Sequence, residues 1–231
     1  MIDSFKKSKV LLIGDLMVDY YCYGESSRLS PEAPVPVVLI SKENIVPGGA
    51  ANVAINLSSL GAEVYCMGYV GKDFYGYELK KILKKNAVNI DLIDDINNYK
   101  TTIKQRVILS KQQTMRIDFE ENYKFFPSKN SLDLLDKIDF DIVLISDYNK
   151  GVISNKWPNF KNFKKVIVDP KKKDFSAYKH SHIITPNISE LENAVGRSLL
   201  SRREILNACS ELFKKILTDF IIVKRGDKGM I

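Results

Sequence analysis

Short apolar segments alternate along this chain with segments that have the periodicity of amphipathic helices. Segments with the composition of buried strands cover residues 10–13, 63–70, 142–146, 166–169, 183–185 and 220–224. Helical patterns follow Gly49 and cover 75–85 and 201–217. This alternation predicts an α/β fold with a mostly parallel sheet that is covered on both faces. Ligands of such sheets bind beyond the carboxyl ends of the strands, so the polar residues there are candidates for a site.

Two segments with β-strand character interrupt the α/β pattern. The first, near 17–40, alternates apolar and polar residues, but its prolines are incompatible with a central strand, so we expect an edge strand or a flap. The second, near 101–120, contains two β-like runs separated by Lys111-Gln112-Gln113, which predicts a hairpin.

A pair of glycines opens the first helical segment, in the run PGGAANVA that begins at Pro47. Because Gly48 and Gly49 have no Cβ, a ligand can approach the backbone at the helix start, where free N–H groups favour polar or anionic atoms. Asn52 adds an amide that suits sugar hydroxyls. The alternative is a tight strand-to-helix turn that required glycine. The expected apolar face of the helix consists of Ala50, Val53, Leu57 and Leu60.

Acidic residues follow two of the predicted strands. The run GDLMVD places Asp15 and Asp19 after the first strand, where a carboxylate can accept hydrogen bonds from two vicinal hydroxyls of a sugar. The alternative for this run is the capping of a helix or a turn. Asp147 follows the strand at 142–146, and the alternative for it is an Asx-turn.

Basic residues follow two further strands. Lys171 comes soon after the strand at 166–169 and either meets a phosphate as a point charge or is a surface lysine. The run VKRGDKG at 223–229 either receives a nucleotide or forms only a hairpin. The sequence contains neither GxxxxGK[ST] nor GxGxxG, so the usual signatures of P-loop and Rossmann sites are absent.

Two segments carry the pattern of an N-terminal capping box. Ser201 with Glu204 begins the helical segment at 201–217, and Asn187 with Glu190 has the same spacing in the run TPNISE. In a functional interpretation Glu190 holds a hydrated Mg²⁺ and Asn187 binds a phosphate oxygen or a metal-bound water. The spacing alone favours the cap.

Composition limits the classes of function. The chain has 231 residues, 45% of them hydrophobic, and a net charge of +7. Its lysines and arginines are dispersed, which indicates a solvated surface or a partner that carries phosphate, and argues against a nucleic-acid partner. Three widely spaced cysteines and no apolar run long enough to span a membrane lead us to expect a cytoplasmic protein with buried thiols and no membrane partner. His180 and His182 lack a third ligand for zinc.

Together these motifs resemble those of the ribokinase-like (PfkB) carbohydrate kinases, where they occur in the same order. The matching runs are GDLMVD, PGGAANVA, GYVGKDFYG, SDYNKG, DPK, TPNISE and VKRGDKG. The segment 24–38 and the run QQTMRIDFEE are most similar to the members of this family that phosphorylate D-glycero-β-D-manno-heptose 7-phosphate. The resemblance extends from about Val10 to Ile231.

The resemblance implies one kinase domain over residues 1–231, with an αβα three-layer core and a small β lid over the sugar. The segments 17–42 and 98–121 are the expected lid. The implied reaction is transfer of a phosphoryl group from ATP, with Mg²⁺, to the anomeric O1 of heptose 7-phosphate in ADP-heptose and lipopolysaccharide core biosynthesis. A homodimer formed through the lid is the implied assembly.

The resemblance also implies roles for single residues. Those expected to bind the sugar are Asp19, Gly48, Gly49 and Asn52, with Asp147 at the same edge. Those expected to organise Mg²⁺ and phosphate are Asn187 and Glu190, the latter through water. Those expected at the nucleotide are Lys224, Arg225 and Gly226. Three further residues are candidates for anchoring a substrate phosphate or the ATP phosphates, although no matched motif fixes their roles. They are Arg106, Arg116 and Lys171.

The sequence departs from the family pattern in one respect. The family's catalytic base is the aspartate of a GAGD motif, which deprotonates the acceptor hydroxyl beside a glycine-rich helix start. No GAGD motif occurs in this sequence, so we expect no catalytic base in it and little or no activity from this chain alone. The alternatives are another sugar kinase of the same family and a non-catalytic module that binds a sugar phosphate.

Overall fold

A seven-stranded sheet forms the centre of the molecule in the computed structural model, which describes residues 8–121, 123–154 and 157–231. All neighbouring strands of this sheet pair in parallel, which confirms the predicted α/β class. In spatial order the strands are β11 (Phe220–Ile221), β10 (Ile183–Ile184), β9 (Val166–Asp169), β8 (Ile142–Ser146), β1 (Lys9–Gly14), β4 (Glu63–Gly71) and β5 (Asn89–Ile96).

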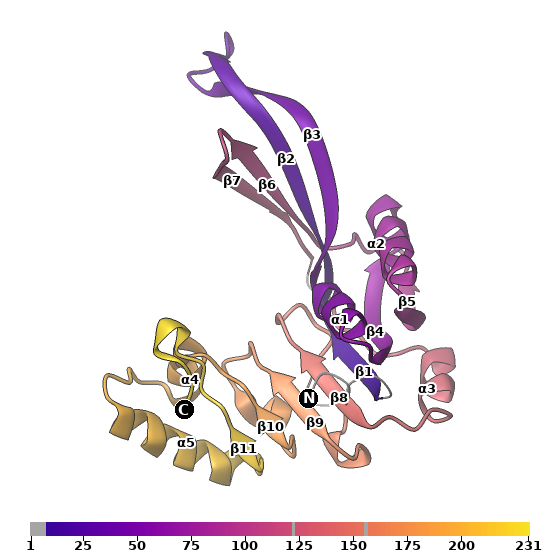
Figure 1. Cartoon of the computed structure of the whole chain (residues 1–231), viewed down its shortest axis with the longest axis vertical. Helices are drawn as coiled ribbons and strands as arrows, with labels where there is room; N and C mark the ends of the chain where they lie inside the picture. Colours follow the sequence, from indigo (N-terminus) through magenta and orange to yellow (C-terminus); the bar gives the residue numbers. More distant parts are fainter. Residues whose placement is uncertain (1–7, 122, 155–156) are drawn as a thin grey trace.

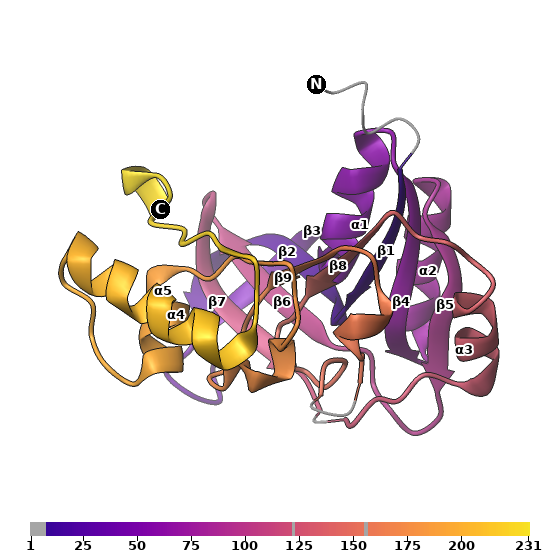
Figure 2. The ribbon, with the colours of Figure 1, turned by 90° about the horizontal axis from the view of Figure 1, so that it is seen from below.

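Two apolar cores lie on the two faces of this sheet. Leu11, Leu12 and Ile13 of β1 are fully buried, and because side chains alternate along a strand, Leu12 joins one core while Leu11 and Ile13 join the other. Helices α1 (Ala50–Ser59) and α2 (Phe74–Lys85) contribute to the core of Leu12, and helices α4 (Ile188–Val195) and α5 (Arg202–Ile216) contribute to the core of Leu11. Figure 2 shows α4 and α5 at one end of the molecule and α1, α2 and α3 (Lys129–Leu135) at the other. Short 3₁₀ helices are η2 (Phe160–Asn162), η3 (Phe175–Tyr178) and η4 (Gly226–Lys228).

A second, four-stranded sheet stands away from the seven-stranded one (Figure 1). Its strands, in spatial order, are β3 (Pro36–Gly49), β2 (Leu16–Leu29), β6 (Ile103–Leu109) and β7 (Gln112–Phe119). Two antiparallel hairpins build it, joined by the parallel pair of β2 and β6. Pro36 and Pro47 of the first hairpin therefore lie in an edge strand, where a missing N–H is tolerated, and Pro31 and Pro34 lie in the loop between β2 and β3. The pairing of β2 with β6 stops at Gly24, so the outer part of the β2–β3 hairpin extends further as a two-stranded ribbon.

The turn of the second hairpin differs from the one we expected. It is formed by Ser110 and Lys111, both with positive φ (49° and 67°), and Gln112 already belongs to β7. Positive φ at both central residues is the geometry that matches the right-handed twist of two paired strands. The twist of the sheet therefore shortens the loop to two residues.

Close packing changes the buried face of α1 from the one we predicted. The buried residues of the helix are Ala50, Ala51 and Ala54, whereas Leu60 is 42% exposed. A Cβ added to Gly14 of β1 would lie only 2.8 Å from the Cβ of Ala50, so this helix approaches the strand too closely for larger side chains. The predicted stripe of larger residues is therefore wrong in part.

The end of the chain also departs from the prediction. We expected a strand over 220–224, but β11 ends at Ile221. The backbone of Val223 instead exchanges hydrogen bonds with Ile231 (2.7 and 3.1 Å), and Lys224 forms an antiparallel bridge with Met230. The run VKRGDKG therefore contains the bend of a hairpin.

Both predicted capping boxes are present. The side chains of Asn187 and Ser201 accept hydrogen bonds from the backbone N–H groups of Glu190 and Glu204, whose carboxylates accept in return from the N-cap N–H groups. These caps fix the starts of α4 and α5. Among the helices that the structure describes, none has the length and apolar character needed to cross a bilayer.

Candidate active site

Asp15 lies at the carboxyl end of β1, where the two sheets meet. Its side chain is only 2% exposed and accepts three backbone hydrogen bonds from the loop after β8: from Tyr148 (2.7 Å), Lys150 (3.1 Å) and Val152 (3.1 Å). Its carbonyl oxygen accepts the N–H of Ala50 (3.0 Å). Asp15 thus fixes both the start of α1 and the loop 147–152.

Burial is the main cause of an unusual pKa at Asp15. This pKa is raised to about 6 in total: desolvation raises it most, the negative charge of Asp147 also raises it, and the backbone hydrogen bonds oppose both by lowering it. Tyr69, Tyr99 and Tyr148 also face this carboxylate, and burial raises the pKa of each of them. Asp15 therefore changes its protonation state close to neutral pH.

Asp147 is buried and holds loops in place. Its Oδ1 accepts the N–H of Asn149 (2.6 Å), which is an Asx-turn, and its Oδ2 accepts the hydroxyl proton of Tyr178 (2.6 Å). The Tyr178 oxygen in turn accepts the N–H groups of Lys171 (3.0 Å) and Lys172 (2.9 Å). Both carboxylate oxygens of Asp147 are thus engaged inside the chain, and the residue positions the start of the segment 171–173.

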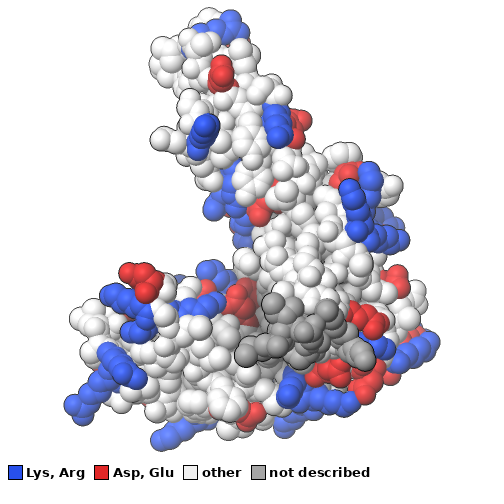
Figure 3. Space-filling model, viewed as in Figure 1, with Lys and Arg blue, Asp and Glu red and all other residues white. Residues whose placement is uncertain are grey.

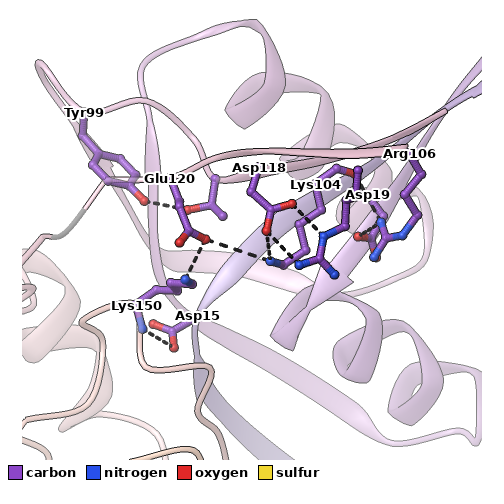
Figure 4. Close-up of polar contacts among 10 residues, drawn as sticks. Asp15, Asp19, Tyr99, Lys104, Arg106, Asp118, Glu120 and Lys150 are labelled. Atoms are coloured by element: carbon purple, nitrogen blue, oxygen red, sulfur yellow. Dashed lines mark hydrogen bonds and ion pairs between the residues drawn. The ribbon is translucent and has the colours of Figure 1, made fainter. Parts of the chain in front are cut away.

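Asp19 and Arg106 come together on the four-stranded sheet (Figure 4). The Oδ1 atom of Asp19 accepts a hydrogen bond from Nη1 of Arg106, 87 residues away in the sequence. The carboxylate also covers Gly48, since a Cβ added there would lie 2.8 Å from Oδ2 of Asp19. Gly48 is required by this contact, because any larger residue would displace the carboxylate.

Further charged residues continue the same face of the sheet toward the core. Lys104 contacts Asp118 (3.2 Å) and Glu120 (4.0 Å), and Arg116 binds Asp118 through Nε (2.9 Å). Glu120 reaches Lys150 in the loop fixed by Asp15 (2.6 Å), as Figure 4 shows. We call this set the charged face of the four-stranded sheet; its members are Asp19, Lys104, Arg106, Arg116, Asp118, Glu120 and Lys150.

Gly49 and Asn52 flank the start of α1. Gly49 has φ of 55° and is packed so closely that a Cβ would lie 2.6 Å from the carbonyl oxygen of Asp15. A residue other than glycine would be strained there by both conformation and contact. Asn52, in the first turn of the helix, is exposed.

A second group of polar residues lies at the ends of β9 and β10. Asp169 accepts hydrogen bonds from Nζ of Lys224 and from the hydroxyl of Thr185 (3.3 Å). Lys224 is brought there by a parallel bridge between its backbone and Asn187. The bridge places the hairpin that follows β11 beside the N-terminus of α4.

Glu190 and Lys171 belong to the same group. The Oε2 atom of Glu190 accepts the N–H of Asn187 (2.9 Å) in the capping box, and its Oε1 atom lies 3.3 Å from Nζ of Lys171. We call this second set the phosphate edge; its members are Asp169, Lys171, Thr185, Asn187, Glu190 and Lys224.

Arg225 and Gly226 follow Lys224 in the bend of the hairpin. The Nη2 atom of Arg225 binds the carbonyl of Lys228 (2.5 Å) within the hairpin bend, and its Nε atom is buried without a hydrogen-bond partner. Gly226 has φ of 60°, and a Cβ there would meet nothing within 4 Å. Arg225 lines a pocket of about 330 Å³ with residues of the α4–α5 connection.

The described structure thus gathers seven of the expected residues into two groups: Asp19, Arg106 and Arg116 on the charged face, and Lys171, Asn187, Glu190 and Lys224 at the phosphate edge. The space-filling view is L-shaped, and its concave side lies between the upright four-stranded sheet and the lower body, with charged side chains on the surfaces that border it (Figure 3). Sequence reasoning did not single out Lys104, Asp118, Glu120 or Lys150. The alternation of Arg116, Asp118 and Glu120 in the run MRIDFE was a usable signal, because residues two apart lie on one face of a strand.

Comparison with known proteins accounts for the fold and most of the motifs. A model of the pfkB family carbohydrate kinases matches residues 7–231. A protein named "Bifunctional protein HldE" from Psychromonas ingrahamii is 38% identical over 239 aligned residues, which cover 99% of this chain and 49% of the relative. The protein of the same name from Shewanella sp. strain ANA-3 is 40% identical, with 99% and 49% covered. The chain therefore spans about half the length of the curated relatives it matches.

Solved structures with a similar fold are sugar kinases of low sequence identity. Ribokinase of Arabidopsis thaliana, solved with ribose and ATP, has a TM-score of 0.74 at 20% identity, covering 96% of this chain and 73% of that one. Phosphofructokinase-2 of Escherichia coli, solved with fructose-6-phosphate, has a TM-score of 0.75 at 18% identity, covering 96% and 75%. The ribokinase-like α/β fold inferred from the sequence is thereby confirmed.

Proposed function

We propose that this chain, which belongs to the pfkB family of carbohydrate kinases, binds a sugar phosphate and ATP for transfer of the γ-phosphoryl group to the sugar. One observation carries the proposal. A group rich in carboxylate and guanidinium lies on the four-stranded sheet, and a group of lysines with an amide and carboxylates lies at the ends of β9 and β10. The first group suits hydroxyls and a phosphate of a sugar, and the second suits the phosphates of a nucleotide.

We assign the substrate as D-glycero-β-D-manno-heptose 7-phosphate, phosphorylated at O1 to the 1,7-bisphosphate. The support is the identity of 36–40% to proteins named HldE over nearly the whole chain, together with the runs that resemble heptose-phosphate kinases. The product would serve ADP-heptose and lipopolysaccharide core biosynthesis. Consumption of ATP and three free, buried cysteines suit the cytoplasm, which we include in the proposal.

In this proposal the sugar lies against Gly48 and Gly49. Asp19 accepts hydrogen bonds from hydroxyls, and Asn52 at the first turn of α1 offers donors and an acceptor. Arg106 and Arg116 take the phosphate that the substrate already carries. They are directly opposite one another in the register of β6 and β7, so both guanidinium groups lie on one face of the sheet.

The phosphate edge suits Mg²⁺ and the phosphates of ATP. Its two carboxylates, Asp169 and Glu190, are hard oxygen ligands at a place that also carries Lys171 and Lys224. Mg²⁺ keeps several waters and uses one or two carboxylates plus substrate phosphates, so Glu190 would hold it through water. When bound, the ion neutralises charge on the phosphoryl group that is transferred. Lys171 and Lys224 would hold the phosphates, and the hairpin at Arg225 and Gly226 would lie beside the nucleotide.

Binding and turnover are tested separately on this chain. We expect calorimetry to detect heptose 7-phosphate, and Asp19→Ala to weaken that binding at least about tenfold, because charged hydrogen bonds contribute about 1.5–3 kcal/mol. Asp139→Ala is the matched control, since this exposed aspartate pairs with Lys164 outside both groups. Unchanged affinity in Asp19→Ala would contradict the placement of the sugar.

The second candidate function is a sugar-phosphate-binding module without catalysis. The observation that favours it is that the charged groups of both sets suit the binding of hydroxyls and phosphates, while none of them is assigned as a catalytic base. ADP release, measured with a panel of sugar phosphates, separates the two candidates. Binding without ADP release supports the module, and release with a different sugar phosphate but none with heptose 7-phosphate would contradict the assigned substrate.

We further propose a homodimer formed through the four-stranded sheet. The face opposite the charged one exposes Met115, Ile117 and Phe119 by 57%, 39% and 49%, and a pocket of about 410 Å³ lies between this face and the start of α2. A contiguous apolar surface of this kind indicates an interface. Sedimentation equilibrium tests it: Ile117→Lys should shift a dimer to monomer, and a wild type that is monomeric at all concentrations would contradict it.

A further inference from the structure

Each cation of the charged face already has a carboxylate partner within the chain. Lys104 and Arg116 share Asp118, Lys150 binds Glu120, and Arg106 binds Asp19. Four cations thus share three carboxylates. These carboxylates do not help the surface to bind phosphate, because each of them weakens its attraction for an anion.

The pair of Asp19 and Arg106 is the most constrained of these. The two side chains are only 21% and 18% exposed, so water screens them less than an ordinary surface pair. Arg106 also donates to the carbonyl of Lys104 (3.2 Å) and lies 5.4 Å from the ring centre of Tyr21. Oδ1 of Asp19 is occupied by the guanidinium, while Oδ2 lies against Gly48. A sugar hydroxyl that approaches Asp19 must therefore compete with Arg106.

We propose that the pair of Asp19 and Arg106 is a specificity gate, in which a phosphate group on the substrate draws Arg106 away and so frees Asp19 for sugar hydroxyls. This inference rests on the proposed function and adds how the site selects its substrate class. A phosphate offers Arg106 a bidentate partner with more negative charge than one carboxylate. Arg116, opposite Arg106 in the sheet register, adds a second guanidinium for the same group.

The gate explains discrimination against sugars that lack the phosphate. A free sugar has to break the ion pair without replacing the partner of Arg106, which leaves a largely buried guanidinium unpaired. A phosphorylated sugar exchanges one partner for another. By thermodynamic linkage, phosphate and hydroxyl binding then strengthen each other even when they come from separate molecules.

The first experiment measures this coupling in the wild-type chain. Calorimetry with the unphosphorylated heptose is performed with and without inorganic phosphate. We expect phosphate to tighten the binding of the free heptose by a factor between about 5 and about 150, the usual range for coupled sites. The same factor should appear when phosphate is titrated with and without the heptose.

Two substitutions should each tighten the binding of one ligand. In Arg106→Ala, Asp19 is free at all times, so the free heptose should bind more tightly than to wild type, while heptose 7-phosphate binds more weakly and the coupling disappears. In Asp19→Asn, the amide no longer holds the guanidinium, so inorganic phosphate alone should bind more tightly. A general loss of structure would weaken every ligand and cannot produce either gain.

Lys164→Ala is the control, because Lys164 pairs with Asp139 in an exposed position outside the charged face. It should leave both affinities and the coupling unchanged. Heptose 7-phosphate that binds wild type, without any effect of phosphate on the free heptose and without a gain in Arg106→Ala, would overturn the gate and leave the proposed function standing. Failure of heptose 7-phosphate itself to bind would overturn the proposed function.

Discussion

The two sheets of this molecule differ in how far the faces of their strands are buried. Neighbouring residues of β1 in the seven-stranded sheet are buried on both faces. The strand β7 of the four-stranded sheet has no fully buried residue, and its two faces differ, one charged and one apolar. A strand buried on both sides contributes stability, whereas a strand exposed on both sides is free to carry a different contact on each face. Under the proposed function, the fold therefore separates stability from recognition.

The largest expected effect tests this separation directly. Leu12→Ala, in the seven-stranded sheet, should lower the free energy of unfolding by about 2–5 kcal/mol, because it opens a cavity at a fully buried position. Ile117→Ala, in the four-stranded sheet, should change it by no more than about 0.5 kcal/mol at protein concentrations at which the chain is monomeric, since the residue is then on the surface. Denaturant unfolding of the two variants measures both values. Similar losses of unfolding free energy in the two variants would contradict the difference between the two sheets.

The second prediction concerns pH. Asp15 has its pKa raised from 3.8 to about 6, so the native state binds its proton more readily than the unfolded chain does. Stability from this group is then fully present below about pH 3.8 and is lost as the pH rises through about 6, by up to about 3 kcal/mol. Unfolding of wild type should show this decrease relative to Asp15→Asn, in which position 15 does not titrate.

For Asp118 of the four-stranded sheet, the expected change of stability with pH has the opposite sign. Burial raises its pKa, but hydrogen bonds and charge from Lys104 and Arg116 outweigh burial and hold the pKa below 3.8. Its contribution is present above that value and is lost as the pH falls further. The same series of unfolding curves with Asp118→Asn should therefore change in the direction opposite to Asp15→Asn. The same direction for both would contradict the contrast.

A smaller effect is expected at the turn of the second hairpin. Lys111 has φ of 67°, which costs a residue with a Cβ about 1–2 kcal/mol relative to glycine in the worst case. Lys111→Gly should therefore raise stability by up to about 1 kcal/mol, with the gain confined to β6 and β7. Hydrogen exchange of these strands measures it. Lys111→Ala is the control, because it removes the same side chain without relieving the backbone.

The smallest effect is expected where the two regions touch. Lys150→Met removes the ion pair with Glu120, whose side chains are 22% and 38% exposed. The loss should be about 0.2–1 kcal/mol and should fall as salt increases. A loss as large as that of Leu12→Ala would show that the sheets are coupled far more strongly than their separate roles imply.

The sequence predicted the central strands of the seven-stranded sheet, but it did not predict the edge strand β5 or the short α-helix α3. The runs at 10–13 and 142–146 are apolar throughout, so burial on both faces is visible in them. β5 was missed because its sequence NIDLIDDI mixes acidic and apolar residues, as an edge strand does, and α3 was missed because seven residues are too few to show a period.

The candidate site was predicted residue by residue but not as an arrangement. Asp19 and Arg106 were both named, yet their contact depends on the parallel pairing of β2 with β6, which joins segments more than 80 residues apart. No local pattern specifies such a partner. Asp147 was named because it follows a strand. In the structure its buried carboxylate accepts hydrogen bonds from Tyr178 and from the backbone of its own loop.

Only Asp15 separates β1 from β2, and this has a mechanical consequence. The 14 residues of β2 extend about 45 Å at 3.3 Å per residue, from a point fixed in the seven-stranded sheet to the far end of the hairpin. At that length a rotation of about 10° at Asp15 displaces the hairpin tip by about 8 Å. The strand therefore acts as a lever, so a small rotation at its base, where Leu16 and Val18 are buried in the core, is magnified at the tip.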